Sequence, residues 1–373
     1  MHISRIATAF PEDEFSTEEL IAHFPCLLPD DVKQNAVNLG VSKRRLLFSH
    51  ICDPDESPVA FEEAYVALCA SACKNAMESE EVSAEQIGCL VATYDASPFL
   101  SPGLSQILMR QLDLGLKARN FNLQGAASTA FHQALEFARS WLSCHPDEKV
   151  LVCVSGINSF WFQNQVRGLD QVLETRQISK IGDTAGRLVA LRKWVAAMQF
   201  FLFGDGVAAV ILEGGKRGLC VGEIVEVTNV NEADYLAGYA ALVPSSEPFR
   251  FGFHAHLGRE IPEMGVKYAD SVLKRLFGEK ELTEAKRVRK WAIHTGSRKI
   301  LTALAEHLSI DGEKLRESHD VLNEYGNLAG ASLPVIVERI VSSSGLSEGD
   351  AILMLGYGWG FSSAACMLEN VGE

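Results

Sequence analysis

The chain has 373 residues, of which 47% are hydrophobic and 22% are charged, and its formal net charge at pH 7 is -14. This length and balance fit a compact protein with two domains or one large double core. The negative charge argues against nucleic acid or an anionic membrane as the main partner. No apolar run reaches the roughly 18 residues that a membrane span requires.

The nine cysteines are odd in number, are scattered along the chain and form no C-x-x-C motif. This usage is typical of reduced thiols in a cytoplasmic protein, and it predicts neither a disulfide framework nor a metal site. The first seven residues, MHISRIA, carry charge within their apolar part. They predict a first strand and not a signal peptide.

Apolar runs alternate along the chain with segments of helical periodicity. Buried strands are expected at 87–93, 149–155, 207–212, 291–294 and 351–355. Helices are expected at 60–78, 129–143, 263–277, 297–308 and 332–344. Because the strands are apolar on both faces, helices must cover both sides of the sheet, which is the pattern of layered α/β proteins.

A weak internal echo suggests two similar halves joined near residues 213–230. Ser128 and Asn327 each begin a helix that leads into a strand ending in a glycine-bearing turn. Chance can produce the same echo, since α/β units share a common size. Residues 156–200 lack strand patterning, and we expect a helical insertion there that shapes a substrate tunnel or a partner surface.

Three polar residues could carry chemistry. Ser128 lies in FNLQGAASTAF (121–131), which reads as a strand, a tight turn and a helix, so its hydroxyl would stand at a helix N-terminus. His294 in AIHTG could take the serine proton, and Asn327 in EYGN could donate to an oxygen that gains charge. Each signal alone is weak, because a serine at a helix start is most often only a cap.

The order of several motifs resembles the thiolase-fold condensing enzymes, in the branch of ketoacyl-carrier-protein synthase III and the type III polyketide synthases. The motifs are FGDGVAA (203–209), HTG (294–296), EYGN (324–327) and GYGWG (356–360). The resemblance implies a five-layered α/β/α/β/α thiolase fold of two similar halves. These would be 1–215, with the insertion at about 156–200, and 216–373.

The resemblance also implies a site and its partners. Ser128, His294 and Asn327 would be catalytic, and the backbone N–H groups of Ser128 and Gly358 would form the oxyanion hole. Acyl-CoA or a phosphopantetheine-linked acyl carrier protein would be the substrate, with no permanently bound cofactor. Family members pair through the first half, which implies a homodimer. The expected basic residues at the tunnel entrance are Lys43, Arg44, Arg45, Arg298 and Lys299.

The nucleophile departs from the family pattern, which has cysteine at this turn. One register places Ala126 at the catalytic position and predicts an inactive subunit, which would form a heterodimer with a cysteine-bearing ketosynthase homologue. The other places Ser128 there, keeps the run to the next strand without a gap, and is the one we favour. A hydroxyl does not ionise through the helix dipole alone, so Ser128 would need His294 as a base.

The sequence therefore predicts a ketoacyl synthase III-like acyltransferase of secondary metabolism. It would move an acyl group from a thioester through an ester on Ser128 to an acceptor, with or without decarboxylative condensation. An inactive partner subunit and an acyl-thioester hydrolase remain as alternatives.

Overall fold

The computed structural model describes residues 1–47, 58–95, 97–215, 217–231, 234, 238–244, 251–257, 261–278, 288–343 and 345–372. Nine strands form one mixed sheet in the order β11-β12-β13-β8-β1-β7-β6-β4-β5. Their bounds are β1 His2–Ala9, β4 Ile87–Tyr94, β5 Arg119–Gln124, β6 Lys149–Ser155, β7 Val207–Glu213, β8 Leu219–Val227, β11 Val288–Ile293, β12 Ala351–Tyr357 and β13 Ser363–Asn370.

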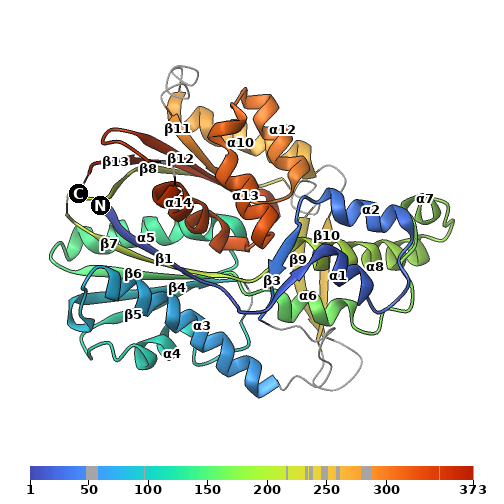
Figure 1. Cartoon of the computed structure of the whole chain (residues 1–373), viewed down its shortest axis with the longest axis horizontal. Coiled ribbons are helices and arrows are strands. Elements are labelled where there is room, and N and C mark those ends of the chain that lie inside the picture. Colours follow the sequence, from blue (N-terminus) through green and yellow to red (C-terminus); the bar gives the residue numbers. More distant parts are fainter. Residues whose placement is uncertain are drawn as a thin grey trace.

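The sheet has two arms that meet at β1. This strand pairs with β7 along its whole length, but with β8 only at His2 and Ile3. The arms can therefore diverge and hold helices between them. Two helices occupy that space, α5 (Ala130–Cys144) and α14 (Ser332–Ser343), and both lie between the arms in Figure 1.

Further helices cover the outer faces of the two arms. On one side are α3 (Pro58–Ser79) and α4 (Leu104–Gln111), and on the other are α10 (Ile261–Phe277) and α12 (Arg298–Leu308). The result is a helix–sheet–helix–sheet–helix order (Figure 1), which confirms the predicted five-layered α/β fold. The apolar strands follow from this order, because side chains on both faces of β4 and β6 are buried.

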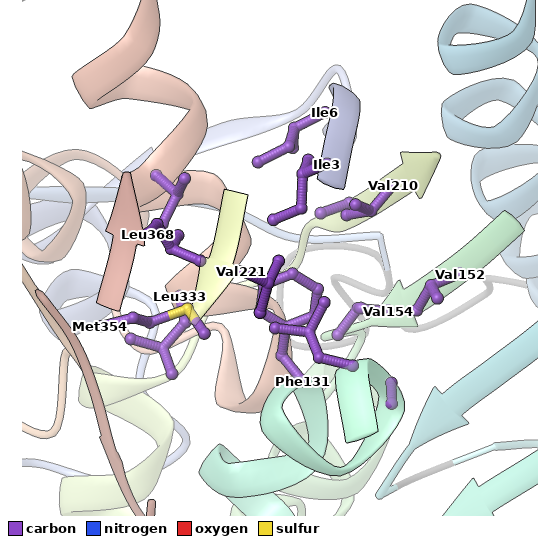
Figure 2. Close-up of a cluster of buried hydrophobic side chains, with 14 of the residues drawn as sticks. Ile3, Ile6, Phe131, Val152, Val154, Val210, Val221, Leu333, Met354 and Leu368 are labelled. Atoms are coloured by element: carbon purple, nitrogen blue, oxygen red, sulfur yellow. The ribbon is translucent and has the colours of Figure 1, made fainter. Parts of the chain in front are cut away.

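The core between the arms is apolar. Phe131 of α5 and Leu333 of α14 are fully buried, and they pack with side chains from β6, β7, β8, β12 and β13 (Figure 2). Helix α5 turns an apolar stripe into this core, because Ala130, Ala134, Leu135 and Ala138 are all buried there. Burial of this stripe fixes the start of α5, and with it the turn that carries Ser128.

Helix α13 (Arg316–Tyr325) packs beside α14 and β11. Most other elements gather at one end of the molecule (Figure 1). They are β2 (Glu14–Ser16), α1 (Thr17–Ala22), α2 (Asp30–Asn38), β3 (Lys43–Arg45), α6 (Ser159–Val166), α7 (Thr175–Ile178), α8 (Thr184–Leu202), β9 (Gly238–Pro244) and β10 (Phe251–Leu257). Helices α6, α7 and α8 confirm that 156–200 is mainly helical. No helix in the described ranges has both the length and the apolar character that crossing a membrane requires.

All predicted strands and helices are present, with ends shifted by a few residues. The end of the helix expected at 332–344 falls on residue 344, which lies outside the described residues. Strand β7 ends at Glu213 and β8 begins at Leu219, so the predicted boundary falls in this connection. Residue 216 lies outside the described residues, and the division into two halves stays a prediction.

Two short 3-10 turns carry the internal echo. Turn η2 (Ala127–Thr129) precedes α5, and turn η5 (Ala329–Ala331) precedes α14. Both begin with an alanine at positive φ, 44° for Ala127 and 48° for Ala329. Matching these alanines aligns Ser128 with Gly330. The sequence echo had matched Ser128 with Asn327, and that alignment was wrong.

Candidate active site

Ser128 lies on turn η2, directly after strand β5 and directly before helix α5. Ala127 before it adopts a left-handed backbone that L-residues with a side chain rarely take. Its N–H donates to Asp95 Oδ1 at 3.0 Å, which holds the turn in this shape. Ser128 is 6% exposed, so its hydroxyl is nearly enclosed.

His294 follows strand β11 and is 2% exposed. Its N–H donates to the carbonyl oxygen of Leu355, and its own carbonyl oxygen accepts the Tyr357 hydroxyl at 2.8 Å. The Tyr357 ring packs edge-on against the imidazole, with ring centroids 5.3 Å apart. Strand β12, which carries Leu355 and Tyr357, therefore fixes the position of the histidine.

Ser128 and His294 are brought together from opposite arms of the sheet. Ser128 Oγ lies 2.7 Å from His294 Nε2, within hydrogen-bonding distance. Burial lowers the pKa of His294 to about 3, because the charged imidazolium is poorly solvated there. A neutral imidazole whose Nε2 accepts the serine hydroxyl must carry its proton on Nδ1, and Nδ1 has no partner in the described part of the chain.

Ala126, the competing position, is arranged differently. Its carbonyl oxygen accepts both the N–H of Thr129 at 3.0 Å and the Thr129 hydroxyl at 2.8 Å. These bonds are those of an ordinary turn residue. It is Ser128, and not Ala126, whose side chain meets the histidine.

Asn327 follows Gly326 at the end of α13 and is 5% exposed. Its Oδ1 accepts the N–H of Ala329 at 2.8 Å, so the amide Nδ2 is the group left to donate to a ligand. Gly326 has φ 74° and ψ -159°, and a Cβ there would lie 2.6 Å from the Leu202 carbonyl oxygen. Only glycine fits this position, which explains the Gly-Asn pair in the sequence.

The histidine and asparagine turns are joined by hydroxyl groups. Thr295 Oγ1 lies 2.7 Å from Ser332 Oγ, and Ser332 Oγ accepts the N–H of Leu328 at 3.0 Å. All three residues are buried. Since Thr295 adjoins His294 and Leu328 adjoins Asn327, the two candidate side chains are held relative to each other.

Gly358 comes close to the serine, but its N–H is already bonded. A Cβ on Gly358 would lie 3.1 Å from the Ser128 nitrogen, so glycine permits the close approach. However, the Gly358 N–H donates to the Ser362 carbonyl oxygen at 2.9 Å. The expectation that Gly358 supplies an oxyanion donor is therefore wrong for this conformation. The Ser128 N–H, in the first turn of η2, has no acceptor within that turn.

These residues line one cavity of about 1420 Å³. Ser128, His294 and Asn327 lie on its wall, together with Trp359, which packs edge-on against Phe203. Helices α6, α7 and α8 add mainly apolar side chains, namely Phe160, Trp161, Phe162, Ile178, Leu191, Trp194, Met198 and Leu202. The helical insertion therefore shapes the chamber next to the serine, as expected from the sequence.

The predicted basic entrance is only partly present. Lys299 is exposed and lines the cavity. Arg298 is exposed beside it but is not among the lining residues. Its backbone N–H donates to the Leu39 carbonyl oxygen.

The other three basic residues lie on strand β3, away from the cavity wall. Arg44 is fully buried, and its Nη2 lies 2.5 Å from Thr17 Oγ1. Burial lowers the pKa of Arg44 to about 9. Lys43 and Arg45 pair with Glu14 at 3.1 and 3.3 Å. Their assignment to the entrance was wrong, because these residues tie β3 to its surroundings.

The motif at 203–209 has a structural role. Asp205 is fully buried and accepts N–H groups from Leu47, Asn158 and Ser159 at 2.7 to 2.9 Å. Burial raises the pKa of this carboxyl group. Asn158 and Ser159 stand at the start of the helical insertion, and Asp205 follows its end. The Asp205 side chain therefore joins the two ends of the insertion.

Asp95 is a site residue that the sequence analysis missed. It directly follows β4 and lines the cavity, and its Oδ1 holds the N–H of Ala127 beside Ser128. Burial raises the pKa of Asp95 to about 6. The signal was available, because side chains at the carboxyl ends of parallel strands commonly face the binding site of an α/β protein.

The layers and the Ser128–His294 contact define an α/β protein with a buried serine and histidine side by side at the wall of a large cavity. Residues 279–370 match the family described as 3-oxoacyl-[acyl-carrier-protein (ACP)] synthase III C terminal. The chain is 22% identical over 345 residues to 3,5-dihydroxyphenylacetyl-CoA synthase of Streptomyces toyocaensis, covering 90% of this chain and 76% of the relative.

The chain is also 21% identical over 312 residues to beta-ketoacyl-[acyl-carrier-protein] synthase III of Desulfotalea psychrophila, covering 83% of this chain and 85% of that one. The crystal structure of 1,3,6,8-tetrahydroxynaphthalene synthase from Streptomyces coelicolor, a bacterial type III polyketide synthase, superposes with a TM-score of 0.80 at 20% identity, and covers the whole of both chains. The chain therefore has the fold of the thiolase-fold condensing enzymes and is similar to their ketoacyl synthase III and type III polyketide synthase members.

Proposed function

We propose that this protein is a ketoacyl synthase III-like acyltransferase of secondary metabolism that uses Ser128 as its nucleophile. The observation that carries the proposal is the 2.7 Å contact between Ser128 Oγ and His294 Nε2 at the wall of a large cavity. A serine hydroxyl needs such a base, and burial keeps the His294 imidazole neutral, so that Nε2 has a lone pair for the serine proton.

The first half-reaction follows from this geometry. Ser128 Oγ attacks the carbonyl carbon of an acyl thioester while its proton passes to His294 Nε2, and the proton then leaves with the thiolate. The Ser128 N–H and Asn327 Nδ2 stabilise the charge that develops on substrate oxygens. The acyl group remains as an oxygen ester, which is less reactive than a thioester, so transfer to the acceptor is slow and selective.

The substrate is proposed to be acyl-CoA or an acyl group on a phosphopantetheine carrier protein, with no permanently bound cofactor. The names of two relatives support this substrate class, because one is a 3,5-dihydroxyphenylacetyl-CoA synthase and the other a beta-ketoacyl-[acyl-carrier-protein] synthase III. Lys299, exposed at the cavity, could receive the phosphates of either carrier.

The test is intact-protein mass after incubation with a panel of acyl-CoA and acyl-carrier thioesters. We expect the mass of one acyl group on the peptide that contains Ser128, and none in Ser128→Ala. Ser97→Ala is the matched control, since it removes another hydroxyl from the same cavity. Labelling that survives Ser128→Ala unchanged would falsify the mechanism. Release of free acid without an acceptor would instead identify a hydrolase.

We also propose that the protein is a homodimer in the cytoplasm. Strand β5 is the last strand of its arm, mostly exposed, with Phe121 at 37% exposure. An exposed edge of this kind is a template for pairing with a second copy. The eight cysteines among the described residues are free thiols, as expected in a reducing compartment. Sedimentation of the purified chain tests the dimer, and a mixed dimer with a cysteine-bearing homologue would replace it.

A further inference from the structure

The cavity contains a second group that can move protons, placed beside the nucleophile but separate from the histidine. Asp95 leaves the end of β4 and lines the cavity, whereas His294 leaves the end of β11 in the other arm. The two groups therefore reach the same space from different directions. The first half-reaction moves its proton through the histidine alone, so the carboxylate holds turn η2 but has no role yet in proton transfer.

The two oxygens of Asp95 have different surroundings. Oδ1 accepts the N–H of Ala127 at 3.0 Å, so the carboxylate is anchored one residue from Ser128. For Oδ2, the described part of the chain shows neither a hydrogen bond nor an ion pair. Asp95 is only partly buried and lines the cavity, so this oxygen can be reached by a ligand there and can accept a hydrogen bond from it.

The histidine and the aspartate are also suited to different work. A pKa of about 3 means that His294, once it holds the serine proton, gives it up readily to a leaving group. A pKa of about 6 makes Asp95 a better proton acceptor near neutral pH. Two groups whose surroundings separate their pKa values in this way commonly divide acid and base roles between them.

We infer that Asp95 is the general base of the second half-reaction and accepts the proton of a neutral O–H or N–H acceptor that attacks the Ser128 ester. This inference rests on the proposed function. The acceptor lone pair forms a bond to the acyl carbon, the carbonyl π electrons move to the oxygen, and the acceptor proton goes to Oδ2. Collapse re-forms the carbonyl and breaks the bond to Ser128 Oγ. The proton held on Asp95 then returns to that oxygen, and both groups are regenerated.

The acylated protein tests this base directly. Wild type, Asp95→Asn and Glu62→Gln are loaded with acetyl groups from acetyl-CoA, and loss of the acetyl group is followed by intact mass. The probes are 1-propanol, a weak nucleophile that needs a base, and hydroxylamine, a strong nucleophile that does not. Asparagine keeps a carbonyl oxygen for the Ala127 N–H, and Glu62 is another carboxylate on the same cavity wall.

We expect Asp95→Asn to acylate at the wild-type rate and to react normally with hydroxylamine, but to lose about 10²-fold in propanol-dependent deacylation. Glu62→Gln should behave as wild type. The wild-type propanol reaction should slow as the pH falls through about 6, where Asp95 gains a proton, and this slope should be missing from Asp95→Asn. The other titratable groups on the cavity wall are Glu62, Tyr94, His294, Lys299 and Tyr357.

Three outcomes would overturn the inference. Normal propanol deacylation by Asp95→Asn removes Asp95 as the base while leaving the Ser128 ester intact. Equal losses with propanol and hydroxylamine assign Asp95 a purely structural role in the η2 turn. The absence of any acetyl adduct on wild-type Ser128 removes the proposed function as well, and it is distinguished from the first two because loading itself fails.

Discussion

The turns η2 and η5 have the same backbone design but carry different residues. Each begins with an alanine at positive φ whose N–H is held by a side-chain oxygen, from Asp95 in η2 and from Asn327 in η5. The next position is Ser128 in one turn and Gly330 in the other. A Cβ on Gly330 would lie 3.2 Å from the Ala127 carbonyl oxygen.

This difference shows how one frame serves two purposes. In η2 the frame presents a hydroxyl group to the cavity. In η5 the corresponding residue is Gly330, which has no side chain and packs against Ala127 of η2. The residue of this turn that lines the cavity is Asn327, whose side chain accepts the Ala329 N–H. The four predictions that follow test this contrast, from the largest expected effect to the smallest.

The largest effect is expected at His294, which contacts the side chain of turn η2 but not that of turn η5. His294→Gln should slow acylation of Ser128 by about 10²- to 10⁴-fold, because the serine loses its proton acceptor. The rate is measured by mass after mixing with an acyl thioester. An unchanged rate would mean that η2 presents a serine that does not depend on the imidazole.

Variants of Asn327 can separate its two roles, which are accepting the Ala329 N–H through Oδ1 and donating to a ligand through Nδ2. Asn327→Asp keeps an oxygen for the Ala329 N–H but loses the amide donor, so acyl transfer should fall by about 10²-fold with little change in stability. Asn327→Leu loses both and should also lower the free energy of unfolding by about 1 kcal/mol. Kinetics and urea unfolding of the pair check this, and equal stabilities would refute the holding role.

A variant of Gly330 tests whether a side chain in turn η5 would disturb the position of Ser128 in turn η2. Gly330→Ser should lower the free energy of unfolding by about 1–3 kcal/mol, since its Cβ meets the Ala127 carbonyl oxygen and the Ala130 Cβ at 3.2 Å. Acylation of Ser128 should slow as well, because Ala127 belongs to its turn. Ser128→Ala is the stability control and should unfold like wild type.

The comparison extends to the helices that follow the two turns, where His132 on α5 should make the stability of the fold depend on pH. This histidine is 1% exposed, and burial lowers its pKa to about 4. At the matching position α14 carries Pro334. Between pH 6.5 and 4 only the unfolded chain binds this proton, so the histidine contributes stability above pH 6.5 that is lost on acidification, at up to about 1.4 kcal/mol per pH unit.

His132→Gln should therefore unfold with a weaker pH dependence than wild type between pH 6.5 and 4. The measurement is urea unfolding at several pH values, with wild type and variant compared at each. Parallel curves would mean that this imidazole is solvated or already charged in the folded protein.

The sequence predicted the layers and the meeting of Ser128 with His294, because buried strands and motif order are local signals that the fold preserves. It was less informative where burial depends on distant packing. The run Lys43-Arg44-Arg45 looks uniformly basic, yet side chains alternate across a strand, and Arg44 points inward. The oxyanion donor assigned to Gly358 failed for the same reason, because its N–H partner Ser362 is brought there by chain reversal between two strands.

Asp205 has one further consequence. Its carboxylate accepts the N–H groups of Asn158 and Ser159, and Asp205 itself follows the end of α8. The start and the end of the helical insertion therefore lie side by side at this one side chain. The two ends of the segment are thereby joined at one carboxylate. The length and packing of the helices between those ends set the width of the chamber, while the serine and histidine are held by other elements.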